Sequence, residues 1–473
     1  MKNIILYSLA LLGFFSTNLL WSAEKPPNIV LIFADDLGYA DLGCFGSTTI
    51  RTPNIDSLAR EGIKLTNFHV PQAVCSASRT ALLSGCYPNR VGILGALGPN
   101  SKNGIKDAEY LLPEHLKKLG YSTAIFGKWH LGDRDGRYPH QRGFDEWYGI
   151  PRTTNETLFT QSPGFDESVV DIPQVMEGFA GQAARNVAEY DLAKRRLIDS
   201  ELTEKSIDFM RRKTQGNAPF FLYVPLTHLH FPTLAHPDFS GKSGVGEFAD
   251  SMMEMDHRVG QLIDAVNNLG IRDNTLFIFA SDNGPEFRRP WRGTAGPWSG
   301  TYHTAMEGGL RVPLIVRWPG RIDKARVSDE IVHVTDLFTT LLDAAGAKLP
   351  QDRPIDGVSQ LDWWTGSTEK SAREGFLFYI KTELRAVKWR HWKLHFVFEN
   401  EPNSGTRHLE TPWLFNIKRD PKEETDVAMD DGWVRGPMRK MIMAFEKTLK
   451  AHPPIAPGAP DEFKPLSNET KFP

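Results

Sequence analysis

The sequence lacks the features that define several large classes of protein. Its 473 residues include only three cysteines, Cys44, Cys75 and Cys86, so a disulfide framework is excluded and at least one thiol stays unpaired. The 55 Lys and Arg are balanced by 58 Asp and Glu, whereas a nucleic-acid-binding protein would show a strong basic excess. There is no internal repeat and no low-complexity tract. The length instead predicts one large domain and a smaller one, with no nucleic acid as a partner.

One N-terminal segment has the pattern of a membrane signal. Residues 1–23 begin with Lys2, continue as an apolar run over 4–20 and reach Ser22-Ala23, which is typical of a secretory signal peptide. The large Trp21 near the cleavage position leaves an uncleaved N-terminal anchor open as an alternative. Because no second long apolar run follows, we expect an exported protein, periplasmic or secreted, with no membrane contact after signal cleavage.

Short apolar runs alternate with amphipathic helical stretches along most of the chain. The runs at 28–34, 121–126, 220–224 and 275–280 read as strands buried on both faces. Between the last two runs, apolar residues recur every three or four positions, which predicts a helix that ends at Gly270. Those residues are Met252, Met255, Val259, Leu262, Val266 and Leu269. The pattern predicts an α/β fold with a central, mostly parallel sheet flanked by helices.

Polar side chains follow each of the four predicted strands. The first strand runs into Asp35-Asp36, the second into Lys128 and His130, the third into His228 and His230, and the fourth into Asp282-Asn283. Ligands of open parallel sheets bind beyond the carboxyl ends of the strands. Each motif taken alone also fits a turn or a helix cap. Together they predict one shared polar site.

The residue types at this site favour a metal ion. Asp35, Asp36, Asp282 and Asn283 offer only oxygen ligands. Carboxylates crowded at one point repel each other unless a cation neutralises them. Ligation by oxygen alone favours Ca²⁺ or Mg²⁺ over zinc.

Cys75 is the candidate nucleophile. The residues from Ser78 onward look like a helix start, so Cys75 is expected just before the helix, where free backbone N–H groups favour a negative atom. Arg79, one turn further on, would point to the same place. The alternative is a buried structural cysteine, the commoner fate of a free thiol.

These motifs resemble those of type I, formylglycine-dependent sulfatases, an arylsulfatase-like family of the alkaline phosphatase superfamily. Cys75-Ser76-Ala77-Ser78-Arg79 is similar to the Cys-x-Pro/Ala-x-Arg signature, in which the cysteine is oxidised to formylglycine. Residues 127–132, 281–284, 307–313 and 318–320 resemble further blocks of the family in the expected order, as do Asp356-Gly357, 414–416 and Asp420-Pro421. The resemblance covers almost the whole chain beyond the signal.

The resemblance implies an alkaline-phosphatase-like α/β catalytic domain and the roles of its residues. Ca²⁺ would be held by Asp35, Asp36, Asp282 and Asn283, with the formylglycine from Cys75 completing the coordination. Arg79 would steady the formylglycine hydrate, and Lys128 and His230 would contact the sulfate group. His130 would take a proton from the hydrate. The implied partners are a sulfated small molecule or glycan and a formylglycine-generating maturation enzyme.

The chain departs from the family near the leaving group of the substrate. Many members carry a lysine five residues before the Glu-Gly-Gly motif, and here that position is Tyr302, followed by His303. We therefore treat Arg292, Tyr302 and His303 as candidate substrate-binding residues. His303 or His230 could protonate the leaving alcohol. If the segment is extended, Tyr302 and His303 point to opposite sides, and His303 faces away from the site.

The C-terminal part of the sequence has a different pattern of apolar residues. Strand-like runs at 375–380, 385–389 and 392–398 and a helical pattern at 438–449 predict a smaller α+β domain with an antiparallel sheet. We assign residues 1–23 to the signal peptide, 24–366 to the catalytic domain and 367–473 to the C-terminal subdomain.

The sequence supports one main functional hypothesis and two alternatives. The main one is an exported, Ca²⁺-dependent sulfatase that acts on a sulfate ester of a carbohydrate or an aryl alcohol. A phosphodiesterase or phosphonate ester hydrolase of the same superfamily is the nearest alternative. A non-catalytic protein that binds sulfated glycans is the other.

Overall fold

The structure is a computed structural model that describes residues 25–99, 101–402 and 404–455. The predicted signal peptide at 1–23 lies outside the described residues. Among those that are described, no helix is both long enough and apolar enough to span a membrane.

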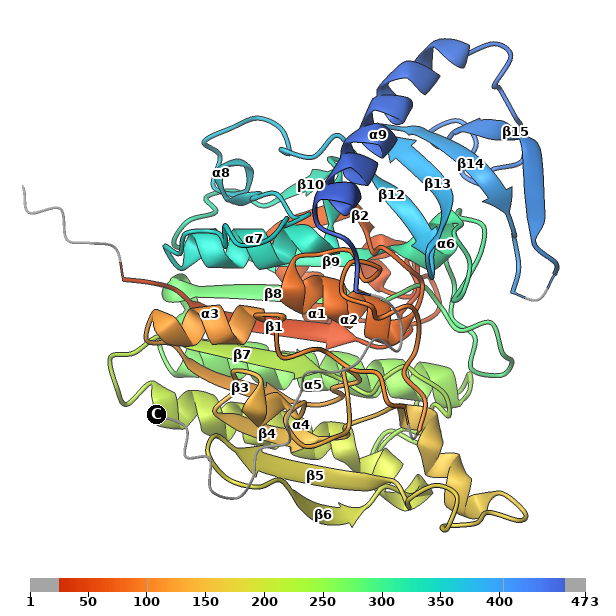
Figure 1. Ribbon diagram of the computed structural model, residues 1–473. Coiled ribbons are helices and arrows are strands. Elements are labelled where there is room, and N and C mark those ends of the chain that lie inside the picture. Colours follow the sequence, from red (N-terminus) through yellow and green to blue (C-terminus); the bar gives the residue numbers. More distant parts are fainter. Residues whose placement is uncertain (1–24, 100, 403, 456–473) are drawn as a thin grey trace, which may run out of the picture.

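A large mixed sheet runs through the middle of the molecule (Figure 1). In spatial order its strands are β10 (Arg326–Ser328), β2 (Ile63–His69), β9 (Arg311–Arg317), β8 (Thr275–Ser281), β1 (Asn28–Ala34), β7 (Phe220–Pro225), β3 (Ser122–Phe126), β4 (Glu146–Gly149), β5 (Gln174–Phe179) and β6 (Arg185–Glu189), and β11 (Val332–His333) pairs with β2. The central strands β8, β1, β7, β3 and β4 are parallel, whereas β9, β5 and β6 are antiparallel to their neighbours.

Helices cover both faces of this sheet, as its all-buried strands require. Alternate residues of β1 face opposite layers, Ile29, Leu31 and Phe33 toward one core and Val30 and Ile32 toward the other. The first core is covered by α2 (Cys75–Ser84), α3 (Leu112–Lys118) and α7 (Val334–Ala344). The second is covered by α1 (Pro53–Glu61), α4 (Leu192–Lys213) and α5 (Glu247–Asn268). Figure 1 shows α3 and α7 in front of the sheet and α4 and α5 behind it.

A second, four-stranded antiparallel sheet lies at one edge of the large sheet (Figure 1). It consists of β12 (Gly375–Ile380), β13 (Glu383–Trp389), β14 (Trp392–Phe398) and β15 (Arg407–Asn416), and α9 (Arg435–Ala451) packs against it. The short helices α6 (Glu307–Leu310) and α8 (Leu361–Trp364) complete the α-helices among the described residues. Short 3-10 turns lie at Gly43–Phe45, Pro139–Gln141, Thr154–Gln161, Arg272–Asn274 and Gly432–Val434.

The predicted fold class is confirmed, although only four strands of the large sheet were predicted and its outer strands were not. The predicted strands correspond to β1, β3, β7 and β8, and the predicted long helix is α5. Strand β15 was not predicted, because residues 407–416 alternate little and are mostly exposed or half-buried. The proposed boundary at Gly366 falls between α8 and β12.

A buried cluster of charges joins the two sheets. Glu307 of α6 accepts hydrogen bonds from Lys388 Nζ of β13 at 2.6 Å and from His69 Nε2 of β2 at 3.0 Å. Lys393 Nζ of β14 lies 3.3 Å from Glu307 and 3.2 Å from Glu423, and all of these groups are buried. Glu307 also lies 3.4 Å from Arg311, so the loss of one cation leaves it with weaker partners and not unpaired. Breaking a buried ion pair is nevertheless far more costly than losing a surface pair.

We therefore predict that Lys388→Met destabilises the protein by about 3 kcal/mol in urea unfolding, because Glu307 loses its shortest ion pair. The matched control is Arg390→Met, which removes a cation from an exposed pair with Glu374 in the same hairpin. The control should cost less than about 1 kcal/mol. Equal costs for the two variants would contradict a stabilising role of the buried cluster.

Candidate active site

Four neighbouring parallel strands bring the predicted polar residues to one edge of the sheet. Strand β1 ends at Ala34, and the next two residues are Asp35 and Asp36. Asp36 has a left-handed backbone conformation with φ 58°, and its N–H donates to Asp282 Oδ1 at 3.2 Å. Asp282 itself follows β8, which pairs with β1 residue by residue up to Ser281. The register of these strands therefore sets the carboxylates side by side.

Two buried cations hold the carboxylates in position. Arg79 of α2 donates to Asp282 Oδ2 from Nε at 3.2 Å and from Nη2 at 2.8 Å, and its Nη2 lies 3.3 Å from Asp35 Oδ1. Lys128, which follows β3, donates from Nζ to Asp35 Oδ2 at 2.7 Å. Arg79 also donates to the carbonyl of Lys128 at 3.1 Å, so the two cationic residues are tied to each other.

The positive charges do not balance the negative ones. Three buried carboxylates, Asp35, Asp36 and Asp282, face two cations. Burial would raise the pKa of Asp35, but Lys128 and Arg79 outweigh it and hold that pKa well below its usual range. Burial and the charge of Asp35 raise the pKa of Asp282 to about 7, and burial with both neighbouring carboxylates raises the pKa of Asp36 well above its usual range. A further positive charge would favour the ionised forms.

The arrangement of oxygen atoms fits a hard cation. Asp35 Oδ1, Asp36 Oδ2 and Asn283 Oδ1 are buried and accept no hydrogen bond from any described residue. Ligand atoms of Asp35, Asp36 and Cys75 all lie within 4.8 Å of one another. Buried oxygens without partners are costly unless a ligand satisfies them, and Ca²⁺ takes this type of ligand. The residues present therefore fit the ion that the sequence resemblance implies.

Cys75 lies beside the carboxylates and opens onto a cavity. It is the first residue of α2 and not a residue before the helix, because Val74 is the last extended residue and the helix begins three residues earlier than the predicted start at Ser78. The cavity has a volume of about 230 Å³ and is also lined by His130, His230 and Tyr302. Burial raises the pKa of the Cys75 thiol well above its usual value, and the three carboxylates add to the effect against the opposing charge of Lys128. The thiol is therefore protonated at neutral pH.

The two histidines of the cavity are each held by one ring nitrogen. His130 Nε2 donates to the carbonyl of Leu97 at 2.9 Å, while its buried Nδ1 has no hydrogen-bond partner in the described part of the chain. His230 Nδ1 donates to the carbonyl of Phe231 at 2.8 Å, which leaves Nε2 3.3 Å from the Thr153 hydroxyl and 3.9 Å from Asp36 Oδ2. Burial and the charge of Lys128 lower the pKa of both histidines. The pKa of His130 lies well below its usual value, and that of His230 is about 3. Both rings are neutral in the free site.

Tyr302 and His303 both line the cavity. The expectation that His303 faces away is wrong, because its backbone is left-handed, with φ 70°, and the alternation of an extended segment is broken there. The two rings lie 4.0 Å apart between centroids. Tyr302 is buried against Val74, Cys75 and Ala77, and His303 is exposed at the mouth.

Arg292 lies elsewhere. Its side chain is exposed and lines a separate hollow of about 260 Å³ with Trp298 and Thr294. Its contact with substrate stays a prediction. The cavity is instead lined by Arg288, which the sequence analysis did not single out. Thr153 and Glu156 were also missed; Thr153 precedes the 3-10 turn Thr154–Gln161 and Glu156 lies within it, and no catalytic motif marks this segment.

Comparisons with known proteins give matches over most of the chain. The family model named Sulfatase matches residues 27–347, and a model of the C-terminal region of N-sulphoglucosamine sulphohydrolase matches residues 302–449. Human arylsulfatase A is 36% identical over 458 residues, covering 90% of this chain and 87% of the relative. Mouse N-acetylgalactosamine-6-sulfatase is 33% identical, covering 93% and 88%. The crystal structure of PsFucS1 sulfatase from Pseudoalteromonas sp. superposes with a TM-score of 0.86 at 29% identity, covering 91% of this chain and 92% of that one.

The charge imbalance predicts a stabilising cation whose effect grows with pH. A carboxyl whose folded-state pKa is raised contributes stability at low pH, which is lost as the pH rises through that pKa, about 7 for Asp282. Without a cation the protein should therefore lose stability between pH 5 and pH 8. We therefore expect Ca²⁺ to raise Tm more at pH 8 than at pH 5. The difference between the two increases in Tm should be roughly 3 °C or more when thermal unfolding is followed at both pH values.

Asp41 provides the matched control for this measurement. Its pKa is also raised to about 7 by burial, but its oxygens accept hydrogen bonds from Gly38 and Thr294. Asp41→Asn should keep the response to Ca²⁺, and Asp282→Asn should lose it. A Ca²⁺ response that is independent of pH, or that survives in Asp282→Asn, would show that the imbalance at this site is not its cause.

Proposed function

The chain belongs to the sulfatase family and is a sulfuric ester hydrolase, and from this premise we propose that it cleaves a carbohydrate sulfate with a formylglycine made from Cys75 and with Ca²⁺ as the metal. One observation carries the proposal. Three buried oxygens without hydrogen-bond partners, from Asp35, Asp36 and Asn283, belong to the group of residues beside Cys75.

The state of Cys75 supports its modification. A thiol that is buried and surrounded by carboxylates stays protonated, and a protonated thiol is a poor nucleophile. A hydrated aldehyde at this position would supply one hydroxyl to attack sulfur and a second to re-form the carbonyl and release sulfate. The spacing from Cys75 to Arg79 is the one that a formylglycine-generating maturation enzyme would read.

The surrounding charges suit an anionic substrate. Ca²⁺, held by Asp35, Asp36, Asp282 and Asn283, would polarise the sulfate group when bound. Lys128 is fully buried and uses one N–H for Asp35, so its other N–H groups can bind a sulfate oxygen. Arg79 is engaged by Asp282, Asp35 and the carbonyl of Lys128, which suits an orienting role.

His130 suits the role of a base. Because Nε2 donates to Leu97, the neutral ring keeps its lone pair on Nδ1, and its lowered pKa keeps the ring neutral. This nitrogen can accept the proton that leaves position 75 when the carbonyl re-forms.

His230 suits the role of the acid that protonates the leaving alcohol. Its ring is buried and fixed by Phe231, with Nε2 directed toward Thr153 and Asp36. The pKa of about 3 applies to the free site, and an anionic sulfate beside Nε2 raises it. Partial burial and then the charge of Arg288 lower the pKa of His303 to about 4, so the pKa does not separate the two histidines. Their positions do, because His303 is exposed at the mouth whereas His230 is enclosed beside Thr153 and Asp36. We therefore assign proton donation to His230 and a substrate contact at the mouth to Tyr302, His303 and Arg288.

The relatives favour a carbohydrate as the substrate. The name of the mouse relative specifies a sulfate on N-acetylgalactosamine. We propose a sulfated sugar or glycan for this chain as well, with aryl sulfates as activated substrates. Export from the cytoplasm, which the N-terminal pattern at 1–23 favours, would bring the enzyme to extracellular glycans.

The most direct test of the modification is the mass of the Cys75 peptide. When the protein is made in a host with a maturation enzyme, the peptide should carry an aldehyde oxygen in place of sulfur. Sulfate release should scale with the modified fraction, because only that form has the second hydroxyl. Cys75→Ala should lose at least roughly a thousandfold in kcat/KM, as expected for a lost nucleophile.

Cys86→Ser is the control, since Cys86 is a second buried thiol that does not line the cavity. It should retain modification and activity. Full activity with an intact Cys75 thiol would refute the proposal. Faster cleavage of the phosphate ester than of the sulfate ester of one alcohol would favour the phosphoesterase alternative.

The assignment of the acid predicts a dependence on the leaving group. His230→Ala should slow an alkyl or sugar sulfate at least roughly tenfold more than an activated aryl sulfate, because only a poor leaving group needs protonation. His303→Ala is the matched variant and should slow both substrates by similar factors. Measured kcat values for the two substrates decide the matter. If His303→Ala shows the selective loss and His230→Ala does not, the acid is His303.

A further inference from the structure

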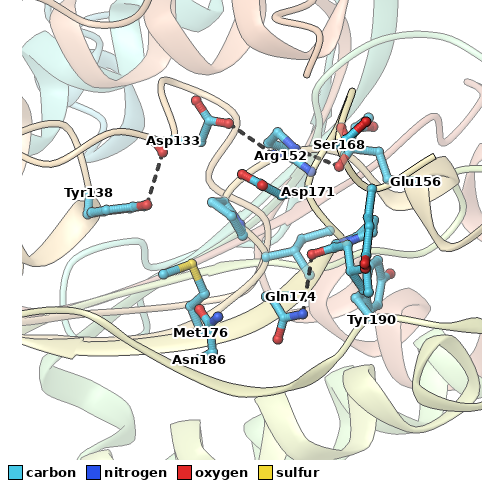
Figure 2. Close-up of a pocket in the computed structure, with 16 residues that line it drawn as sticks. Asp133, Tyr138, Arg152, Glu156, Ser168, Asp171, Gln174, Met176, Asn186 and Tyr190 are labelled. Atoms are coloured by element: carbon cyan, nitrogen blue, oxygen red, sulfur yellow. Dashed lines mark hydrogen bonds and ion pairs between the residues drawn. The ribbon is translucent and has the colours of Figure 1, made fainter. Parts of the chain in front are cut away.

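A second and larger hollow adjoins the Cys75 cavity. Its volume is about 640 Å³, within the range of sites that bind small molecules. In Figure 2, Tyr138 lies on one side and Glu156 and Tyr190 on the other, with Asp133, Arg152 and Asp171 between them. The floor is formed in part by Gln174 and Met176 of β5.

The two hollows share part of their walls. Thr153 and Glu156 line both of them. The Thr153 hydroxyl is also 3.3 Å from His230 Nε2. The proposed acid of the reaction therefore lies on the side of the Cys75 cavity that adjoins the larger hollow. The leaving alcohol of the substrate is expected on that side.

The larger hollow carries an excess of negative charge. Four carboxylates line it, from Asp133, Glu156, Glu167 and Asp171, against the single cation of Arg152. Arg152 is already paired, with Glu156 at 2.6 Å and with Asp133 at 3.2 Å. Glu167 and Asp171 are exposed and remain as negative charges on the lining.

Glu156 carries a hydrogen-bonding group without a partner. Its side chain is only 2% exposed, and Oε1 has no hydrogen-bond partner in the described ranges. A buried acceptor of this kind needs a donor, which a ligand or a water molecule in the hollow can supply. These carboxylates do not converge on one point as metal ligands do, because the only such group among the described residues is that of Asp35, Asp36 and Cys75. A donor-rich organic ligand fits better than a metal ion.

We propose that this hollow binds the sugar unit next to the sulfated one, and that it selects a unit with an amine or without charge over a unit with a carboxylate or a second sulfate. The inference rests on the proposed function. Sugar hydroxyls and an ammonium group donate hydrogen bonds to carboxylates, and the half-buried ring of Tyr138 offers an apolar surface for the sugar ring. An anionic unit would be repelled by Glu167 and Asp171.

The test compares three disaccharides that share one sulfated unit. The neighbouring unit carries an amine, a hydroxyl or a carboxylate at the same position. A small aryl sulfate, which fills only the Cys75 cavity, is the reference for catalysis. Each kcat/KM is divided by that of the aryl sulfate. The wild-type ratios should fall in the order amine, hydroxyl, carboxylate, and the spread should shrink as salt is raised from 20 mM to about 500 mM.

The decisive variant is the double substitution Glu167→Gln/Asp171→Asn. Both side chains are exposed, so the fold should persist, which circular dichroism checks. The ratio for the carboxylate-bearing substrate should rise at least roughly threefold, because two nearby repulsive charges are gone. The matched control, Asp430→Asn, removes an exposed charge from the C-terminal region and should leave all ratios unchanged.

Two results would overturn the inference, and they can be told apart. If the aryl sulfate is cleaved but the double variant keeps the wild-type ratios, the hollow does not select the neighbouring unit. If neither the aryl sulfate nor any disaccharide releases sulfate from modified, Ca²⁺-loaded protein, the proposed function fails and this inference fails with it.

Discussion

The site depends on one electrostatic constraint, a buried group of three carboxylates that two cations do not neutralise. Arg79 and Lys128 fix Asp35 and Asp282 by direct contacts, yet a negative charge remains, together with oxygens that accept no hydrogen bond. Such a group is tolerated in the interior if its carboxyls take up protons or if a cation completes it, and at neutral pH and above a cation is needed. Burial keeps the proton on Cys75 and the three carboxylates reinforce it, so its own thiol is a poor candidate for the nucleophile.

Two parts of the fold hold the residues of this site in place. The parallel register of β3, β7, β1 and β8 brings residues from four distant parts of the chain to one edge, and α2 brings Cys75 and Arg79 to the same edge. The C-terminal sheet contributes indirectly, through contacts outside the site. Its lysines Lys388 and Lys393 hold Glu307, which follows the Tyr302–His303 segment of the cavity after only a few residues. The smaller domain therefore supports the mouth of the site.

Much of this was predictable from the sequence, for identifiable reasons. Strands buried on both faces are continuous apolar runs, so β1, β7 and β8 could be predicted. Ligands bind at the carboxyl ends of parallel strands, and this rule predicted that Asp35, Lys128, His230 and Asp282 lie together. The orientation of His303 was not predictable, because a single left-handed residue reversed the expected alternation. Arg288, Thr153 and Glu156 were missed because loop contacts depend on tertiary packing. The exposed position of Arg292 was missed for the same reason.

The central claim is that the charge imbalance is resolved by Ca²⁺ and that catalysis requires it. The most direct measurement strips the modified protein with a chelator, restores Ca²⁺ in steps, and determines bound metal by elemental analysis and sulfate release on the same samples. The account predicts that activity rises in proportion to bound Ca²⁺ and saturates at a single ion per chain. Full activity in metal-free protein, or stoichiometric zinc in the active enzyme, would contradict it.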